Sequence, residues 1–117
     1  MSGGQQKTVL QMERKIMYQY RAKVARVVDG DTVDFLVDLG FGVTMKIRGR
    51  LTGVNTPERG HPQWTLATNT CVDLLNKVTN ELGYITISTG KTGKYGRWLV
   101  TIDGVNDVLA TTWPYED

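Results

Sequence analysis

The sequence predicts a mainly β fold with helices, in one domain of 117 residues. Polar and apolar residues alternate in several short segments, glycines separate these segments, and only one long segment has helical spacing. Hydrophobic residues make up 40% of the chain and charged residues 22%. This composition excludes a disordered, collagen-like or coiled-coil chain.

The first three strands are expected to form a meander. Residues 20–28, 32–38 and 43–51 each alternate between polar and apolar side chains, as half-buried strands do. Asp29-Gly30-Asp31 lies between the first two, and Asp-Gly favours a tight hairpin turn. The glycine-rich residues 39–42 form a second turn. Short turns make sequential strands neighbours in the sheet.

One main helix is expected after the meander. Apolar side chains between residues 64 and 82 can share one helical face, and Gly83 follows as a stop signal. The remaining elements are predicted in order as a loop over 53–62, a strand over 84–89, a basic loop over 90–96, a strand over 97–102 and a short helix over 105–111.

This order of elements predicts a five-stranded barrel of the OB type, with one main helix and a short C-terminal helix. Residues 20–112 form the domain, residues 1–19 an N-terminal arm or short helix, and residues 113–117 an acidic tail. Such barrels bind oligonucleotides, but a fold by itself does not establish function.

The charge of the chain is unevenly distributed. The net charge is +2; residues 1–28 hold six Lys/Arg against one Glu, and residues 29–58 hold five acids against three bases. A basic body with a local acidic cluster fits a protein that contacts polyanions and holds a cation. Taken alone, this distribution is also typical of an ordinary solvated surface.

The sequence has no pattern of a membrane or secreted protein. No apolar run approaches the roughly 20 residues that span a bilayer, and the first 30 residues lack a secretory signal pattern. A single cysteine, Cys71, cannot form an internal disulfide, which fits a reducing compartment. We therefore expect a cytoplasmic protein of bacterial or phage origin, without a membrane partner.

Three short motifs contain the residues that could carry chemistry. They are Asp29-Gly-Asp-Thr32, Val54-Asn-Thr-Pro-Glu58 and Lys94-Tyr-Gly-Arg97. Each motif alone is typical of a turn. Together they supply the residue types of a metal and phosphate site.

The first two motifs supply ligands for a hard cation. Asp31, Asn55 and the carbonyl of Thr56 offer carboxylate, amide and backbone oxygens, which Ca²⁺ prefers. Glu58 lies three residues beyond Asn55 and is the natural group to orient or deprotonate a water molecule. These residues predict water-dependent chemistry next to a metal ion.

The cationic residues of this set fit a phosphate group. Arg50 and Arg97 each lie beside one motif, and guanidinium groups stabilise the charge that develops on a phosphate under attack. Lys94 and Tyr95 could bind a terminal phosphate or stack on a base. The predicted reaction is therefore hydrolysis of a phosphodiester.

The three motifs in this order, with a helix between the second and third, resemble the staphylococcal nuclease (thermonuclease) family. The resemblance covers roughly residues 20–111, and the chain looks like a small, truncated member. It implies an OB barrel with Ca²⁺-dependent endonuclease activity on DNA and RNA that leaves 3′-phosphate ends. Single-stranded DNA or RNA is the implied substrate, and a homo-oligomer is possible.

The resemblance also assigns roles to individual residues. It places metal ligands at Asp31, Asn55 and the Thr56 carbonyl, the general base at Glu58, phosphate-clamping arginines at Arg50 and Arg97, and nucleotide-phosphate contacts at Lys94 and Tyr95.

Two departures from the family pattern affect these expectations. Asn55 stands where aspartate is usual, so Ca²⁺ should bind more weakly and Mg²⁺ or Mn²⁺ could serve. The chain also ends before the third helix of the best-known members. Either the N-terminal arm or a second subunit is expected to cover the barrel there, and Trp113 or Tyr115 could replace the family's aromatic base contacts.

The alternative is a non-catalytic OB module that binds nucleic acid or a protein partner. The sequence feature that separates the two is the set of Asp31, Arg50, Glu58 and Arg97. A binding module does not need two arginines and a glutamate around a metal ligand, so this set favours the enzyme.

Overall fold

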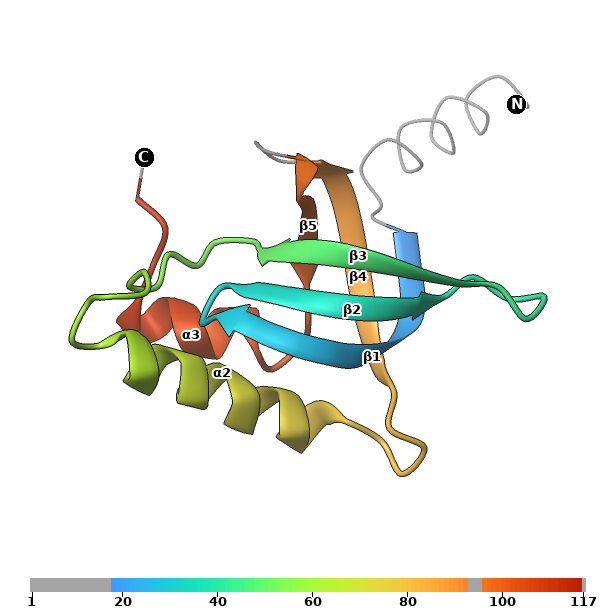
Figure 1. The fold of residues 1–117 in the computed structure, drawn as a ribbon, viewed down its shortest axis with the longest axis horizontal. Helices are drawn as coiled ribbons and strands as arrows, with labels where there is room; N and C mark the ends of the chain where they lie inside the picture. The colour runs from blue at the N-terminus through green and yellow to red at the C-terminus, as the bar shows by residue number, and fades with distance from the viewer. Residues whose placement is uncertain (1–17, 93–95, 117) are drawn as a thin grey trace, which may run out of the picture.

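The computed structural model describes residues 18–92 and 96–116. Within them it forms a closed five-stranded barrel with two helices (Figure 1). In chain order the elements are β1 (Tyr18–Asp29), β2 (Thr32–Asp38), β3 (Thr44–Leu51), α2 (Trp64–Val78), β4 (Ile85–Thr92), β5 (Trp98–Thr101) and α3 (Asn106–Thr112). Lys94, Tyr95 and residues 1–17 of the predicted arm lie outside the described residues.

The barrel has the strand order β1-β2-β3-β5-β4, and β4 pairs back onto β1. β3 and β5 run parallel, whereas the other neighbouring pairs are antiparallel. The predicted meander, main helix and short C-terminal helix are all present. The mainly β fold with an OB-type barrel is therefore confirmed.

The core fills the barrel and extends beneath α2. Val33, Phe35 and Val37 alternate along β2 and are buried, and the helices add Cys71 and Leu109 to the same cluster. Burial raises the pKa of the Cys71 thiol to about 12. The thiol is therefore protonated at neutral pH and acts as a small packing residue.

Two elements differ from the sequence prediction. α2 ends at Val78 rather than at residue 82, because the Asn80 side chain starts a turn by accepting the backbone N–H groups of Leu82 and Tyr84. Gly83 adopts a positive φ of 86° within this turn instead of ending the helix. β4 runs on to Thr92, into the segment predicted as a basic loop.

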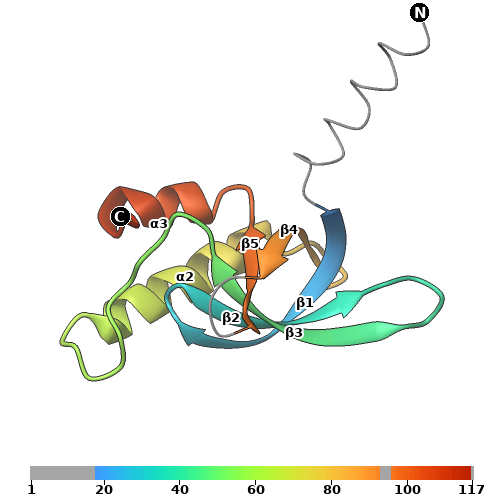
Figure 2. The same cartoon turned by 90° about the horizontal axis from the view of Figure 1, so that it is seen from above.

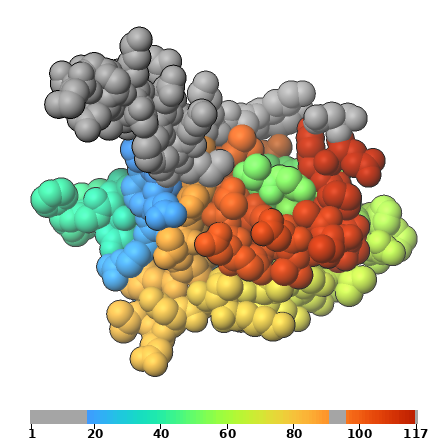
Figure 3. All heavy atoms as spheres, turned by 180° about the vertical axis from the view of Figure 1, so that it is seen from behind, coloured from blue at the N-terminus to red at the C-terminus, as the bar shows by residue number. Residues whose placement is uncertain are grey.

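The helices and the β1–β2–β3 sheet lie on different sides of the molecule. Figure 2, seen from above, shows α3 and most of α2 on the side of the three strands that faces away from the viewer of Figure 1, and Figure 3 shows both helices at the surface seen from behind. Neither α2 nor α3 lies over the face of β1–β2–β3 that points toward the viewer in Figure 1. No helix in the described part of the chain is long and apolar enough to cross a membrane.

Asp34, a polar residue of β2, is buried and forms an ion pair. It is only 4% exposed, and Arg48 donates to both of its oxygens, over 2.8 Å from Nε and 3.2 Å from Nη2. The hydrogen bonds from Arg48 lower the pKa of the Asp34 carboxyl. The carboxylate thus stabilises the folded state at neutral pH, when it is charged in both states.

We expect Asp34→Asn to lower the free energy of unfolding at pH 7 by about 1–3 kcal/mol, because the charge-assisted hydrogen bonds are lost. Folding lowers the pKa of the Asp34 carboxyl. The extra stability of the wild type is therefore complete above the pKa of an unfolded aspartate, about 4, and is lost as pH falls through the lower pKa of the folded state. Urea unfolding from pH 7 to pH 3 measures this difference. Asp38→Asn is the control, because the Asp38 side chain is 27% exposed against 6% for Asp34, so the loss should be smaller.

Candidate functional site

Asp31 lies at the centre of the site, in the turn between β1 and β2. The Thr32 hydroxyl donates to its Oδ1 over 3.0 Å, and the backbone N–H of Thr56 donates to its Oδ2 over 3.0 Å. The Asp31 carbonyl also accepts the N–H of Leu51 at the end of β3. The carboxylate is therefore held in one orientation by the two segments that contain the first two motifs.

Gly30 allows α2 to approach this turn. Its φ is not positive, so the turn does not need glycine for its backbone conformation. A Cβ added at Gly30 would lie 2.9 Å from the backbone oxygen of Ala67 and 2.8 Å from Cγ2 of Thr56. The absence of a side chain therefore lets α2 and the Thr56 segment pack against the turn.

We expect Gly30→Ala to destabilise the protein by about 1–3 kcal/mol, because the backbone of α2 must move to accept a methyl group. Thr56→Ser removes Cγ2 but leaves the Ala67 backbone in place. Adding Gly30→Ala to the Thr56→Ser variant should therefore still lower the stability, but by less than Gly30→Ala lowers that of the wild type. Thermal unfolding of the four proteins measures this, and unchanged stability of Gly30→Ala would contradict the packing explanation.

Arg50 connects the ligands proposed for the cation. Its Nη1 lies 3.3 Å from Asp31 Oδ2, and its Nη2 donates to Asn55 Oδ1 over 3.4 Å. Nη1 also donates to the backbone carbonyls of Leu51 and Val54. Carboxylate and amide oxygens from two separate segments therefore converge on one positively charged group.

This convergence is the observation that tests whether the residues fit a metal ion. Asp31 Oδ2 and Asn55 Oδ1 both contact the Arg50 guanidinium, and carboxylate and amide oxygens are ligands that a hard cation accepts. The donor set is poor in charge: among the described residues, no three His, Cys, Asp or Glu side chains are grouped as a metal site. The buried hydroxyl of Thr56 has no hydrogen-bond partner within the described chain. The residues fit a weakly held, oxygen-coordinated cation.

Glu58 lies in the loop between β3 and α2 and is exposed. Its carbonyl accepts the backbone N–H of His61, and His61 Nδ1 accepts the N–H of Gln63. His61 is thus an exposed loop residue that shapes the start of α2.

One contact that anchors this loop has no signal in the sequence. The Trp64 indole N–H donates to Asp29 Oδ1 over 2.7 Å, and the Arg59 guanidinium lies 5.0 Å from the Trp64 ring centroid. This bond ties the first residue of α2 to the last residue of β1. Asp29 therefore positions the loop that contains Glu58.

The structure brings six of the eight predicted site residues together around one pocket of about 230 Å³. Of the predicted site residues, only Lys94 and Tyr95 are missing from its walls, and both lie outside the described residues. The pocket is lined by Asp29, Asp31, Thr32, Arg50, Asn55, Thr56, Glu58 and Arg97. Its walls therefore combine carboxylates, amide and hydroxyl groups with two guanidinium groups.

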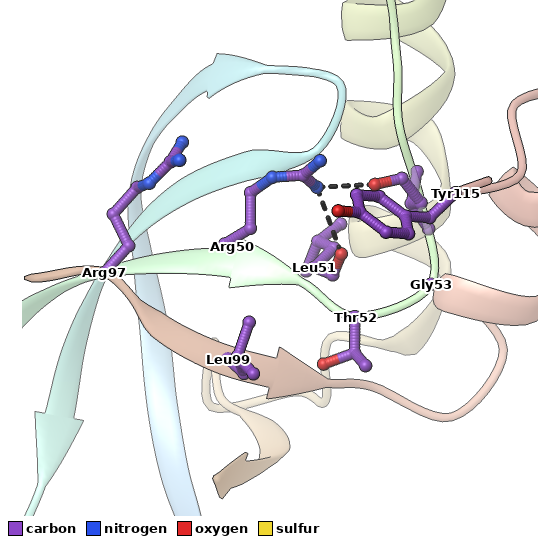
Figure 4. Close-up of a pocket in the computed structure, with 8 residues that line it drawn as sticks. Arg50, Leu51, Thr52, Gly53, Arg97, Leu99 and Tyr115 are labelled. Atoms are coloured by element: carbon purple, nitrogen blue, oxygen red, sulfur yellow. Dashed lines mark hydrogen bonds between the residues drawn. The ribbon is translucent and has the colours of Figure 1, made fainter. Parts of the chain in front are cut away.

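A second pocket of about 390 Å³ adjoins the first and shares Arg50 and Arg97 with it (Figure 4). Leu51 and Leu99 line it, and Tyr115, which is 57% exposed, closes one side. Trp113 packs against the hydrophobic core instead. Of the two aromatic residues considered for a base contact, only Tyr115 lines a pocket beside the arginines.

Fold and site together define a small OB-type barrel with a charged pocket at one end. Comparison with known proteins adds no identification: no protein-family model matches the chain, and no curated protein matches it. The resemblance to the staphylococcal nuclease family therefore rests on the three motifs alone.

Proposed function

We propose that the protein is a metal-dependent endonuclease that hydrolyses phosphodiester bonds of single-stranded DNA and RNA and leaves 3′-phosphate ends. The observation that carries the proposal is the convergence of Arg50, Arg97, Glu58 and the Asp31–Asn55 oxygens on one pocket. These residues come from β3, the segment before β5 and two loops. Few functions other than phosphate chemistry require this combination.

The metal ion would be held by Asp31, Asn55 and the Thr56 carbonyl. Ca²⁺ is the first choice for such oxygen ligands, and Mg²⁺ or Mn²⁺ the next. When bound, the ion neutralises phosphate charge and lowers the pKa of a coordinated water. Asp31 is kept in a fixed orientation for this task by Thr32 and by the Thr56 N–H.

Glu58 accepts the proton of the attacking water as the water oxygen bonds to phosphorus. The bond from phosphorus to the 5′-oxygen breaks, and the leaving 5′-oxygen takes up a proton from solvent water. Arg97 and Arg50 donate to the phosphate oxygens, where negative charge increases in the transition state. For this, Arg50 exchanges its contact with Asp31 for the phosphate. Tyr115 stacks on the neighbouring base in the apolar second pocket.

A non-catalytic OB module is the second candidate, and one observation favours it. Arg50 contacts Asp31, Asn55 and the backbone carbonyls of Leu51 and Val54, and these contacts hold together the turn after β1 and the loop after β3. In a binding module, an arginine with these contacts stabilises the loop after β3 and takes no part in a reaction. Binding without cleavage is the result that this alternative predicts.

The test is cleavage of labelled single-stranded DNA and RNA with Ca²⁺, Mg²⁺, Mn²⁺ or EDTA. We expect cleavage with at least one metal, none in EDTA, and 3′ ends that need a 3′-phosphatase before polymerase extension. If folded protein cleaves nothing with any metal, the nuclease proposal is wrong. If it still binds the strand, the OB module becomes the function.

A further inference from the structure

The hairpin between β2 and β3 ends in an exposed apolar tip. Figures 1 and 2 show the hairpin extending beyond the barrel at one end of the molecule. Phe41 at its apex is fully exposed. Four further apolar residues of the hairpin are 38–50% exposed: Leu36, Leu39, Val43 and Met45. The folded domain therefore presents a cluster of apolar side chains here that it does not bury.

The tip has a defined backbone in spite of its exposure. The Leu39 N–H donates to the Val43 carbonyl over 2.9 Å, and the Val43 N–H donates to the Gly40 carbonyl over 2.8 Å. Phe41 has a φ of 55°, in the left-handed region that bulky side chains disfavour. Glycine or asparagine adopts this conformation at a lower cost. Phe41 thus does not stabilise the domain itself, and a contact outside the domain explains its presence.

Apolar side chains lie on both faces of the hairpin. Strand pairing places Leu36 beside Lys46 on the outer face and Met45 beside Val37 on the inner face. Phe41 is at the apex, where the two faces meet. A flat protein surface would cover one face and leave the other in water, whereas a lipid phase surrounds the tip on all sides.

Positive charge lies directly behind the tip. Arg21 is next to Asp38 in the last strand row and neutralises its carboxylate over 2.7 Å. Lys23 and Lys46 flank Leu36 in the next row, about 6.6 Å farther from the tip. Both lysines are exposed and form no ion pair within the described chain. The lysine row therefore carries two uncompensated charges beside the apolar tip.

The opposite side of the barrel has the opposite charge. α3 and the segment that follows it, residues 106–116, contain Asp107 and Glu116 but no Lys or Arg. Figures 1 and 2 place α3 across the barrel from the hairpin, toward the other end of the molecule. A negatively charged surface therefore attracts the hairpin end and repels the far end.

We propose that the β2–β3 hairpin docks the protein on a bilayer that contains anionic lipids. The apolar tip enters the interface, and Lys23 and Lys46 contact the headgroups. Interfacial segments enter a bilayer by roughly 5–10 Å, so a tip at this depth leaves the lysine row at the headgroups. Such docking needs no apolar run long enough to span the membrane.

The docking element is separate from the pocket. The pocket lies at the other end of β2 and β3, where Thr32 pairs with Arg50. A docked protein therefore keeps its pocket open to solvent, and the inference does not rest on the nuclease proposal.

The test is co-sedimentation with lipid vesicles in EDTA. The vesicles consist of phosphatidylcholine alone, or of a mixture in which roughly a third of the lipid is phosphatidylglycerol. The variants are Phe41→Asn, which removes the ring but suits the positive φ, and Lys46→Gln. Their matched controls are Leu82→Asn in the turn after α2, where Leu82 is 70% exposed, and Lys77→Gln in the last turn of α2.

We expect the wild type to bind the anionic vesicles more tightly than phosphatidylcholine alone. Phe41→Asn should lower the partition coefficient by about 10- to 100-fold, the effect of withdrawing one large apolar side chain from lipid. Lys46→Gln should lower it by about 5-fold, the usual contribution of one cation at an anionic surface. Both controls should bind like the wild type. Thermal unfolding should show Phe41→Asn to be at least as stable as the wild type, because asparagine relieves the backbone strain.

The inference is wrong if the wild type does not bind anionic vesicles at low salt, or if Phe41→Asn binds as well as the wild type. Equal losses in the control variants would show non-specific adsorption and also reject it. Sedimentation velocity without lipid tests a second copy as the occupant: a dimer that Phe41→Asn dissociates would assign the tip to that contact instead. Cleavage without vesicle binding rejects only the docking, and vesicle binding without cleavage rejects only the nuclease.

Discussion

Replacing Glu58 with glutamine is expected to lower the cleavage rate by about 10²–10⁴-fold, the usual contribution of a general base. Glutamine keeps the size of the side chain but cannot accept the proton of the attacking water. Glu58 is exposed, and it accepts the N–H of His61 through its backbone carbonyl, not through its side chain. Folding and strand affinity should therefore be unchanged.

The measurement is the single-turnover rate at saturating metal, with unfolding curves beside it. Glu81→Gln is the control, because Glu81 is also exposed but lies in the turn after α2. If Glu58→Gln cleaves at the wild-type rate, Glu58 is not the general base. A loss in both variants would indicate an effect of net charge.

The arrangement of strands was predictable because local patterns determine it. Alternation in β2 places Val33, Phe35 and Val37 on the inner face, and the short turns force neighbouring strands to pair. The end of α2 was not predictable from Gly83, because the Asn80 side chain offers the backbone a turn earlier. Side chains that compete with the helix for backbone hydrogen bonds override the glycine signal.

The contents of the site were predictable, but its internal contacts were not. The three motifs and Arg50 supplied the residues that line the pocket, whereas the bond from Trp64 to Asp29 joins residues 35 positions apart. No local pattern encodes such a pair. The same holds for Gly30, which is typical of a turn in the sequence but in the structure makes room for Ala67 and Thr56.

Removing a negative charge at position 31 should weaken metal binding, and adding one at position 55 should strengthen it. Asp31→Asn removes the carboxylate from the proposed ligand set, and we expect the metal concentration for half-maximal cleavage to rise by about 100-fold or more. Asn55→Asp adds a carboxylate where Oδ1 already points to the guanidinium of Arg50. This variant should reach half-maximal cleavage at a lower metal concentration than the wild type.

The maximal rate of Asn55→Asp separates metal binding from the role of Arg50. A charged oxygen 3.4 Å from Nη2 holds Arg50 more firmly than the amide does, so the rate at saturating metal should fall even as affinity for the metal rises. Metal titrations of cleavage measure both quantities, with Asp73→Asn on the exposed side of α2 as control. If Asn55→Asp leaves the half-maximal metal concentration unchanged, residue 55 is not a ligand, and its role is to orient Arg50 alone.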